Sequence, residues 1–380
     1  MGVFVFLPLV LPLSAWPVAR LAEVHLHPRT ATRLLTAFAV VMVVCSTLCL
    51  ALLMVVGTAQ LPGNPLPDGW SDPEVRAAVP QDEVAGRAAV PALCVVAAAC
   101  ARTLWRHRRV TSRARRALGP VGTTPQTPRR PARRFAALPN RPHGSSPTPD
   151  SARAGGPSSR SWGRLATART GGHGSRPSGG RPERDAGPRA AQPGPAVAVL
   201  PDRTPYAYAL PGGRGRIVVT TGLLSGLAPA ERRALFAHER AHLVARHHRH
   251  LLAVHLAARA NPFLRPLRTA VVYTAERWAD EEAAHAVGDR RTVARAIGKA
   301  ALLSRGTPAP TLAALASTGP VPRRVAALLA PAPVARTWPS AFTSVGLAVW
   351  CAAAGALVSA MSSANSAVTL FRILRAATPL

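Results

Sequence analysis

Long uncharged stretches constrain the fold of this chain most strongly, because about 20 apolar residues are enough to cross a bilayer as a helix. Residues 34–56 form such a stretch, with no charged residue between Arg33 and Asp68. Residues 342–361 form a second one, inside an uncharged run that ends before Arg372. We therefore predict a membrane-spanning helix in each.

Two shorter stretches complete the predicted membrane region. Residues 3–19 are apolar and contain three prolines. Because no basic segment precedes them, we favour a kinked span over a cleavable signal peptide. Residues 88–101 are a weaker candidate, since Arg87 and Arg102 enclose only 14 uncharged residues and must reach the interfaces with their long side chains. The chain is thus predicted to have four spans, three of them within residues 1–105 and the fourth within residues 336–380.

The distribution of charge predicts which side of the membrane each segment faces. Arginines follow the first span and crowd after the third, whereas five acidic residues lie between the second and third spans. Loops rich in arginine stay in the cytoplasm. We therefore predict a multi-pass protein of the cell membrane, with an outside N-terminus and a cytoplasmic segment between the third and fourth spans.

Residues 106–195 have a composition unlike the rest of the chain. They contain 19 arginines against three acids, with abundant Pro, Gly and Ser and few large apolar residues, so we predict a disordered linker. It could be inert, hold anionic membrane lipid, or bind nucleic acid. The net charge of +30 is weak support for nucleic acid, because Lys299 is the only lysine and the arginines reflect a general compositional bias. Membrane lipid is the better partner.

The segment Phe236-Ala237-His238-Glu239-Arg240-Ala241-His242 contains the pattern HExxH. Residues four apart share one face of a helix, so His238 and His242 can bind one metal ion. Zinc held by three protein ligands lowers the pKa of bound water to about 7, and a neighbouring carboxylate can take its proton. The pattern therefore predicts a Zn²⁺ site with Glu239 as the general base.

Two residues compete to be the third zinc ligand. His248 has the spacing of the extended motif HExxHxxGxxH, but Ala245 replaces the glycine that breaks the helix there. Alanine favours helix, so we expect the helix to continue through Arg246 and to turn His248 away from the metal. Glu276 is the preferred ligand. Asp280, four residues later on the same helical face, could accept the free ring N–H of a ligand histidine.

Charged residues next to HExxH exclude a site in the centre of the bilayer. Three charged residues precede the motif, and a run of arginines and histidines follows it, at too high a cost for lipid. We predict that His247, His248 and His250 form a solvated basic helix end near anionic lipid, in preference to a second metal site.

Taken together, these residues resemble the BlaR/MecR-type membrane metallopeptidases. The likeness runs over about residues 200–332, through Leu210-Pro211-Gly212, HERAHL, Asn261-Pro262 and Glu276-Arg277-Trp278-Ala279-Asp280. More distantly, HExxH with a downstream ExxxD is similar to HtpX-like peptidases. The resemblance implies zinc ligands His238, His242 and Glu276, with Glu239 as base and Asp280 beside a ligand. It does not extend to beta-lactam sensing, since only a short tail follows the last span.

The expected architecture is mainly α, with multi-span membrane helices and a zincin-like (gluzincin) α+β metallopeptidase domain over residues 196–335. Residues 206–210 and 216–221 predict a hairpin across a turn rich in glycine. We expect an edge strand that binds substrate in extended form, made of Ile217, Val218, Val219, Thr220 and Thr221. One helix is predicted from about Leu264 and a further helix over residues 276–286.

The function predicted from the sequence is zinc-dependent endopeptidase activity at the membrane. Its substrate would be a cytoplasmic or membrane-proximal protein or peptide, for which the resemblance suggests a repressor in a signalling pathway. The alternative is a membrane signal transducer that uses the zinc fold as a binding or conformational module with little proteolysis.

Overall fold

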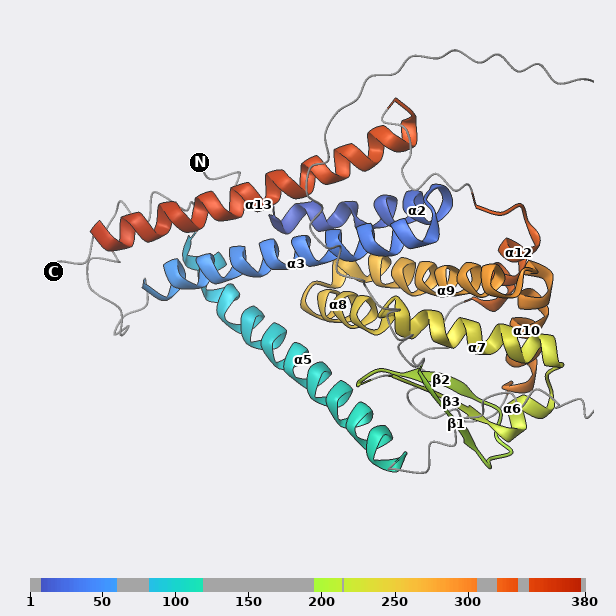
Figure 1. Ribbon diagram of the computed structural model, residues 1–380. Coiled ribbons are helices and arrows are strands. Elements are labelled where there is room, and N and C mark those ends of the chain that lie inside the picture. Colours follow the sequence, from blue (N-terminus) through green and yellow to red (C-terminus); the bar gives the residue numbers. More distant parts are fainter. Residues whose placement is uncertain are drawn as a thin grey trace, which may run out of the picture. The chain divides into compact units, whose positions relative to one another are not determined.

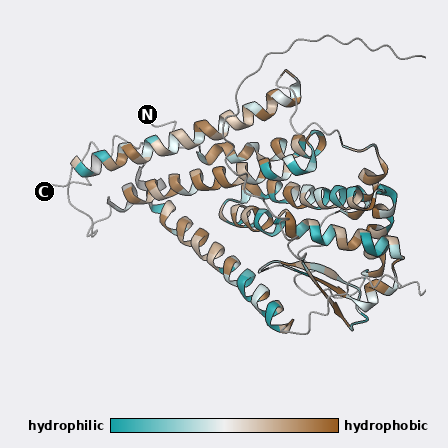
Figure 2. Ribbon diagram, in the orientation of Figure 1, coloured by the Kyte–Doolittle hydropathy of each residue, from teal (hydrophilic) through white to brown (hydrophobic). Residues whose placement is uncertain are grey.

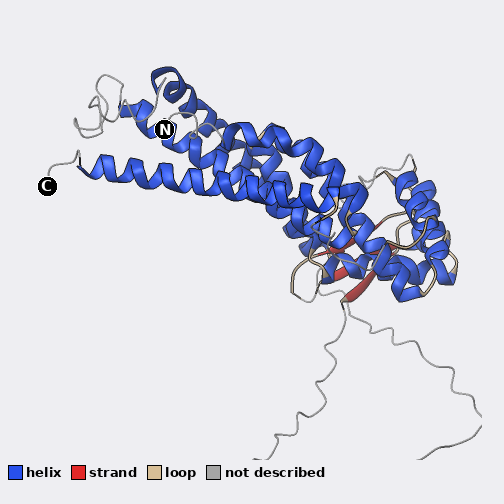
Figure 3. Cartoon of the chain, turned by 90° about the horizontal axis from the view of Figure 1, so that it is seen from above, coloured by secondary structure: helices blue, strands red, loops and turns tan. Residues whose placement is uncertain are grey.

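The structure is a computed structural model of the 380-residue chain. It describes residues 8–59, 82–118, 195–213, 215–305, 320–333 and 342–376, and all of these belong to one compact unit. Of the predicted linker, residues 106–195, the part from residue 119 to residue 194 lies outside the described residues, so its disorder remains a prediction. The described part is mainly helical, with three strands gathered beside the helices (Figure 3).

Within the described residues, three helices are long and apolar enough to cross a membrane: α3 (Pro28–Ala59), α5 (Asp82–Ala117) and α13 (Ser344–Ala376). Hydrophobic residues run along most of α3, as Figure 2 shows. These helices contain the second, third and fourth predicted spans. The first, residues 3–19, lies partly outside the described residues. Its described portion forms the short 3₁₀ helix η1 (Leu11–Ser14) and the start of α2 (Ala15–His25).

The boundary between the third span and the linker was predicted wrongly. We placed it after residue 105, but α5 continues through Ala117 and includes the first arginines assigned to the linker. The end of this helix has contacts that a disordered segment lacks: Arg115 donates to the carbonyl of Pro211, and Arg216 donates to that of Leu118. Arginine has a high helix propensity, and these contacts hold the helix end against the turn between two strands.

The strands β1 (Ala196–Leu200), β2 (Ala207–Leu210) and β3 (Arg216–Thr220) form one sheet in the order β1-β3-β2. The predicted hairpin is confirmed, because β2 and β3 pair antiparallel across a turn in which Gly212, Gly213 and Gly215 have positive φ. The sequence did not reveal β1, which pairs parallel to β3.

This topology corrects the predicted edge strand. Residues 217–220 belong to β3, which lies between β1 and β2 and therefore has partners on both sides, while Thr221 already begins α6 (Thr221–Ser225). Among the described strands, β2 is the edge that lies against the HExxH helix α7 (Pro229–Val244).

The helix α7 begins where its sequence predicts. Pro229 occupies the first turn, and the carboxylate of Glu231 accepts the N–H of Ala228 at 2.8 Å. Its end differs from the prediction. The helix stops at Val244 because Arg246 adopts a left-handed conformation, with φ of 53°, and α8 (His247–Ala260) starts at the next residue.

The second half of the domain centres on α9 (Arg265–Val287), which follows the 3₁₀ turn η3 (Pro262–Leu264). We predicted two helices here, but the chain forms one, since no glycine or proline interrupts it after Pro266. Two shorter helices pack nearby, α10 (Arg290–Leu303) and α12 (Val321–Leu329).

Helix α9 joins the predicted membrane region to the HExxH helix, because it packs against both α3 and α7 (Figure 1). Its first half contributes Leu267, Ala270 and Val271 to a buried core shared with α2, α3 and α8. Thr32 of α3 donates from its hydroxyl to Thr274 Oγ1 at 3.0 Å. The helix that carries Glu276 is therefore held directly by the base of a candidate span.

Candidate metal centre

The two histidines of HExxH lie on one face of α7 with their rings in contact. His238 Nε2 and His242 Nε2 are 3.1 Å apart, and the ring centroids are separated by 4.8 Å in an edge-to-face arrangement. Both side chains are largely buried. The helical spacing of four residues thus presents two nitrogen donors to one point.

Helix α9 brings Glu276 to the same point. Its carboxylate oxygens lie 3.5 Å from His238 Nε2 and 3.4 Å from His242 Nε2. One turn later, Asp280 Oδ1 lies 3.0 Å from His238 Nδ1, on the far side of that ring. The structure therefore brings together the four predicted residues from two helices.

The distances among the donor atoms suit a tetrahedral metal ion. Ligand bonds of about 2.0–2.1 Å, as zinc makes, correspond to separations of about 3.4 Å between ligand atoms, and the observed values are 3.1–3.5 Å. Two imidazoles and one carboxylate are also a donor set typical of zinc enzymes. Within the described residues, these three side chains form the one group of His, Cys, Asp and Glu that could hold a metal.

Arg324 of α12 is a member of the site that sequence reasoning missed. Its guanidinium donates two hydrogen bonds to Asp280, at 2.6 and 2.8 Å, and lies 2.9 Å from Glu276 Oε2. The side chain is buried. No local pattern marks it among the many arginines of the chain. The signal that could have led to it was indirect: two buried carboxylates so close together require a cation.

The charges around the site favour a divalent cation. Buried Glu276 and Asp280 contribute two negative charges and Arg324 contributes one positive charge, so these three side chains sum to −1, and Glu239 adds another negative charge when it is deprotonated. The same field acts on His238: although burial alone would lower its pKa, hydrogen bonds to Asp280 and Glu276 raise that pKa to about 10. Burial opposes ionisation of Glu276, but Arg324 and the histidines hold its pKa well below the usual range.

Glu239 lies next to the ligands and is also buried. Burial raises the pKa of its carboxyl to about 7, although nearby positive charge and a hydrogen bond from the backbone N–H of Ala209 act in the opposite direction. A group with a pKa near 7 can both accept and release a proton near neutral pH. The contact with Ala209 also places Glu239 beside β2.

The histidines after the motif do not behave as one group. We predicted that His247, His248 and His250 form a solvated helix end, which is wrong for His247, since this side chain is 0% exposed. Its Nδ1 lies 3.0 Å from His242 Nδ1, and burial lowers its pKa to about 2, so the ring is neutral. His248 and His250 are half-buried and lie outside the group that could hold a metal.

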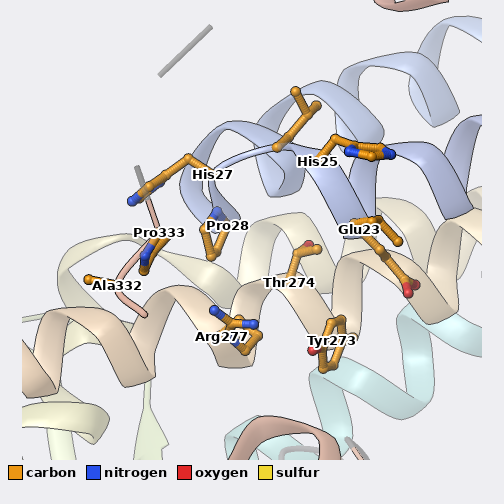
Figure 4. Close-up of a pocket in the computed structure, with 11 residues that line it drawn as sticks. Glu23, His25, His27, Pro28, Tyr273, Thr274, Arg277, Ala332 and Pro333 are labelled. Atoms are coloured by element: carbon orange, nitrogen blue, oxygen red, sulfur yellow. The ribbon is translucent and has the colours of Figure 1, made fainter. Parts of the chain in front are cut away.

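The structure also contains a cavity of about 250 Å³ (Figure 4). It is formed by the connection between α2 and α3, the middle of α9 and the residues that follow α12. Figure 4 shows Arg277 and Tyr273 of α9 lining it. None of the predicted site residues lines this cavity.

Comparison with known proteins gives a family match for part of the chain. The model of peptidase family M48 matches residues 183–259, which include the sheet, α6, α7 and most of α8. No curated protein and no solved structure matches the chain. The match contains His238, Glu239 and His242 and is consistent with the expected likeness to BlaR-type and HtpX-like peptidases. Glu276, Asp280 and Arg324 lie beyond it.

Proposed function

We propose that this protein is an integral-membrane, zinc-dependent endopeptidase. The observation that carries the proposal is the convergence of His238, His242 and Glu276, at separations suited to zinc, beside the buried carboxylate of Glu239. The M48 peptidase match and three helices able to cross a membrane support it independently. A likeness to the BlaR/MecR-type subfamily in particular is part of the proposal.

The residues of the site have separate roles in peptide hydrolysis. A zinc ion bound by His238, His242 and Glu276 would act as a Lewis acid and lower the pKa of water to about 7. Glu239 takes a proton from the attacking water as the water oxygen bonds to the peptide carbonyl carbon. It then gives that proton to the amine nitrogen as the C–N bond breaks. Asp280 Oδ1 lies 3.0 Å from His238 Nδ1, where it would accept the N–H of that ring and so fix its orientation.

We propose that the substrate binds in extended form along β2. This replaces the strand predicted from the sequence, since β3 already has two partners. Among the described strands, β2 has a partner on one side only, and it lies beside the site, because Ala209 of this strand donates its N–H to Glu239. A strand added to that edge would pass the catalytic carboxylate with its backbone held by main-chain hydrogen bonds.

The experiment that tests the proposal is the substitution Glu239→Gln in the full-length protein. It preserves the shape of the side chain and all three metal-binding residues, so zinc binding should remain while cleavage of protein substrates is lost. Comparing protein termini in cells that carry the wild type or the variant would reveal the substrates. Cleavage that continues in Glu239→Gln would refute the role of Glu239 as the general base. If signalling depends on the protein but persists in Glu239→Gln, the module interpretation replaces the peptidase.

We further propose that the catalytic domain faces the cytoplasm and acts on a cytoplasmic or membrane-proximal protein, such as a repressor. The support is the excess of arginine after the third predicted span. A reporter phosphatase fused after Ala190 should be inactive if this orientation is correct. Strong activity of that fusion outside the cytoplasm would reverse the topology without affecting the metal site.

A further inference from the structure

His247 is a buried histidine to which the proposed mechanism assigns no role. It is the first residue of α8, five residues after His242, and its side chain is 0% exposed. Its Nδ1 lies 3.0 Å from His242 Nδ1, and the two rings meet edge to face with centroids 4.8 Å apart. Within the described residues, its other nitrogen, Nε2, has no hydrogen-bond partner. The contact with His242 is therefore the polar contact that holds this ring.

The direction of this hydrogen bond follows from the geometry of His242. Its Nε2 faces His238 and Glu276, so this nitrogen must offer its lone pair to a metal ion. A neutral imidazole carries its one hydrogen on the other nitrogen. Nδ1 of His242 is then the donor, and Nδ1 of His247 must accept. The contact thus selects the tautomer of His242 that can bind metal.

The backbone before His247 is arranged to make this contact. On a continuous helix, residues five apart point about 140° away from each other, so the ring of His247 could not reach that of His242. Instead the chain breaks at Arg246, whose φ of 53° and ψ of 41° are rare for a residue with a Cβ. Such strain persists only where surrounding contacts enforce it. At Arg246 this conformation turns the ring of His247 back toward His242, one of the proposed zinc ligands.

Trp278 holds His247 from another direction. Its ring centroid lies 4.7 Å from that of His247, at an angle of 59° between the rings. Trp278 is itself fixed, because its indole N–H donates to Glu282 Oε1 at 3.0 Å. It stands two residues after Glu276 on α9, so the helix that supplies the third metal-binding residue also limits the movement of His247.

We propose that His247 is a positioning residue, which orients the metal-binding ring of His242 by accepting its Nδ1–H. The inference rests on the proposed zinc site and deepens it. Each of the two histidines of HExxH then has its own acceptor: Asp280 for His238 and the neutral ring of His247 for His242. A neutral acceptor adds no negative charge to a cluster that already contains three buried carboxylates.

Two substitutions in the full-length protein separate positioning from packing. His247→Phe keeps a ring against Trp278 but removes the acceptor. His247→Asn loses the ring but places an amide oxygen near the former position of Nδ1. Zn²⁺ dissociation constants, measured by competition with a chelator, should rise about 10–100-fold for His247→Phe and should largely recover in His247→Asn. His248→Asn is the matched control and should bind zinc like the wild type.

Two further measurements make the outcome unambiguous. The visible absorption of Co²⁺ bound in place of zinc should change in His247→Phe and return toward the wild-type spectrum in His247→Asn, since it reports ligand geometry. In the presence of a chelator, the Tm of His247→Phe should be higher than that of His247→Asn, because phenylalanine fills the buried site better. The order of stability is then the opposite of the order of zinc affinity. If His247→Phe does not fold, His247→Ala takes its place against His247→Asn.

The result that overturns the inference is a zinc affinity for His247→Phe equal to that of the wild type, or one higher than that of His247→Asn. Either would show that the ring of His247 serves packing alone. These outcomes differ from failure of the proposed function, in which the wild-type protein itself would bind no zinc.

Discussion

Replacing Arg324 with methionine should destabilise the protein far more than the same change at its neighbour Arg323. The Arg324 side chain is 7% exposed and contacts Asp280 at 2.6 and 2.8 Å and Glu276 at 2.9 Å. Methionine keeps much of the apolar stem but removes the cation. Two carboxylates, with side chains 0% and 5% exposed, would then remain buried without their arginine partner.

The size of the effect follows from this burial. Removing one partner of a buried ion pair costs about 3–5 kcal/mol, because the remaining charge is left without compensation. In a domain of roughly 150–250 residues, each kcal/mol lowers Tm by about 2–4 °C. The expected fall is therefore about 6–20 °C. Bound zinc should reduce the loss, since the ion supplies positive charge beside Glu276.

Arg323→Met is the matched control. The side chain of Arg323 is 41% exposed, and it pairs with Glu23 at 2.7 Å and lies over the ring of Tyr273 at 4.0 Å. Exposed ion pairs and cation–π contacts each contribute at most about 1 kcal/mol. The two neighbouring arginines thus differ in environment while the chemical change is the same.

The assay is unfolding of the full-length protein in detergent, once with a chelator and once with saturating Zn²⁺. Adding Asp280→Asn to Arg324→Met should recover part of the lost stability, because it removes one of the two uncompensated charges. Equal losses for Arg323→Met and Arg324→Met, with or without zinc, would refute the reasoning. So would a double variant that is less stable than Arg324→Met.

Three further predictions concern the metal and the protonation of a buried acid. Chelation should abolish peptidase activity, and zinc at about 100 times its Kd should restore activity and add about 2.7 kcal/mol of stability; activity after complete metal removal would contradict a zinc enzyme. Glu276→Gln should weaken zinc binding by more than about tenfold, whereas Glu281→Gln on the same helix should not change it. Although burial acts in the opposite direction, hydrogen bonds from Lys299 and Ala228 lower the pKa of Glu231. The ionised Glu231 therefore stabilises the fold at pH values above 4.5, the pKa of the group in the unfolded chain, and this stabilisation is lost as the pH falls through the lowered pKa. The metal-free Tm of Glu231→Gln should consequently fall less on acidification than that of the wild type.

Local patterns were enough to predict the residues that the structure brings together at the candidate metal centre. The spacing of His238 and His242 puts both rings on one helical face wherever the helix lies, and the acids of α9 have the same spacing. The hairpin and the start of α7 were also predictable, because glycine turns and a proline with a capping glutamate act over a few residues. Long apolar runs likewise predict the candidate spans from composition alone.

Other features depended on contacts between distant segments. Propensity favoured a helix through Arg246, but the packing of His247 between His242 and Trp278 accompanies a left-handed residue there. The edge strand was predicted wrongly as β3. The strand β1 pairs parallel to β3 along the edge that β2 leaves open, and such non-local pairing has no local sequence signal. Arg324 carries no local signal, since its role comes from α12 lying against α9.

The sequence by itself determined the candidate metal-binding residues and the candidate spans of this protein, because possible metal-binding donors at a helical repeat and apolar runs of bilayer length are properties of short segments. Only the tertiary structure decided which further residues belong to that centre. Arg324 and His247 join Asp280, which the sequence predicted, in contact with the proposed metal-binding side chains. Burial, which sets the cost of every uncompensated charge and every unpaired ring nitrogen, is a property of the folded chain as a whole.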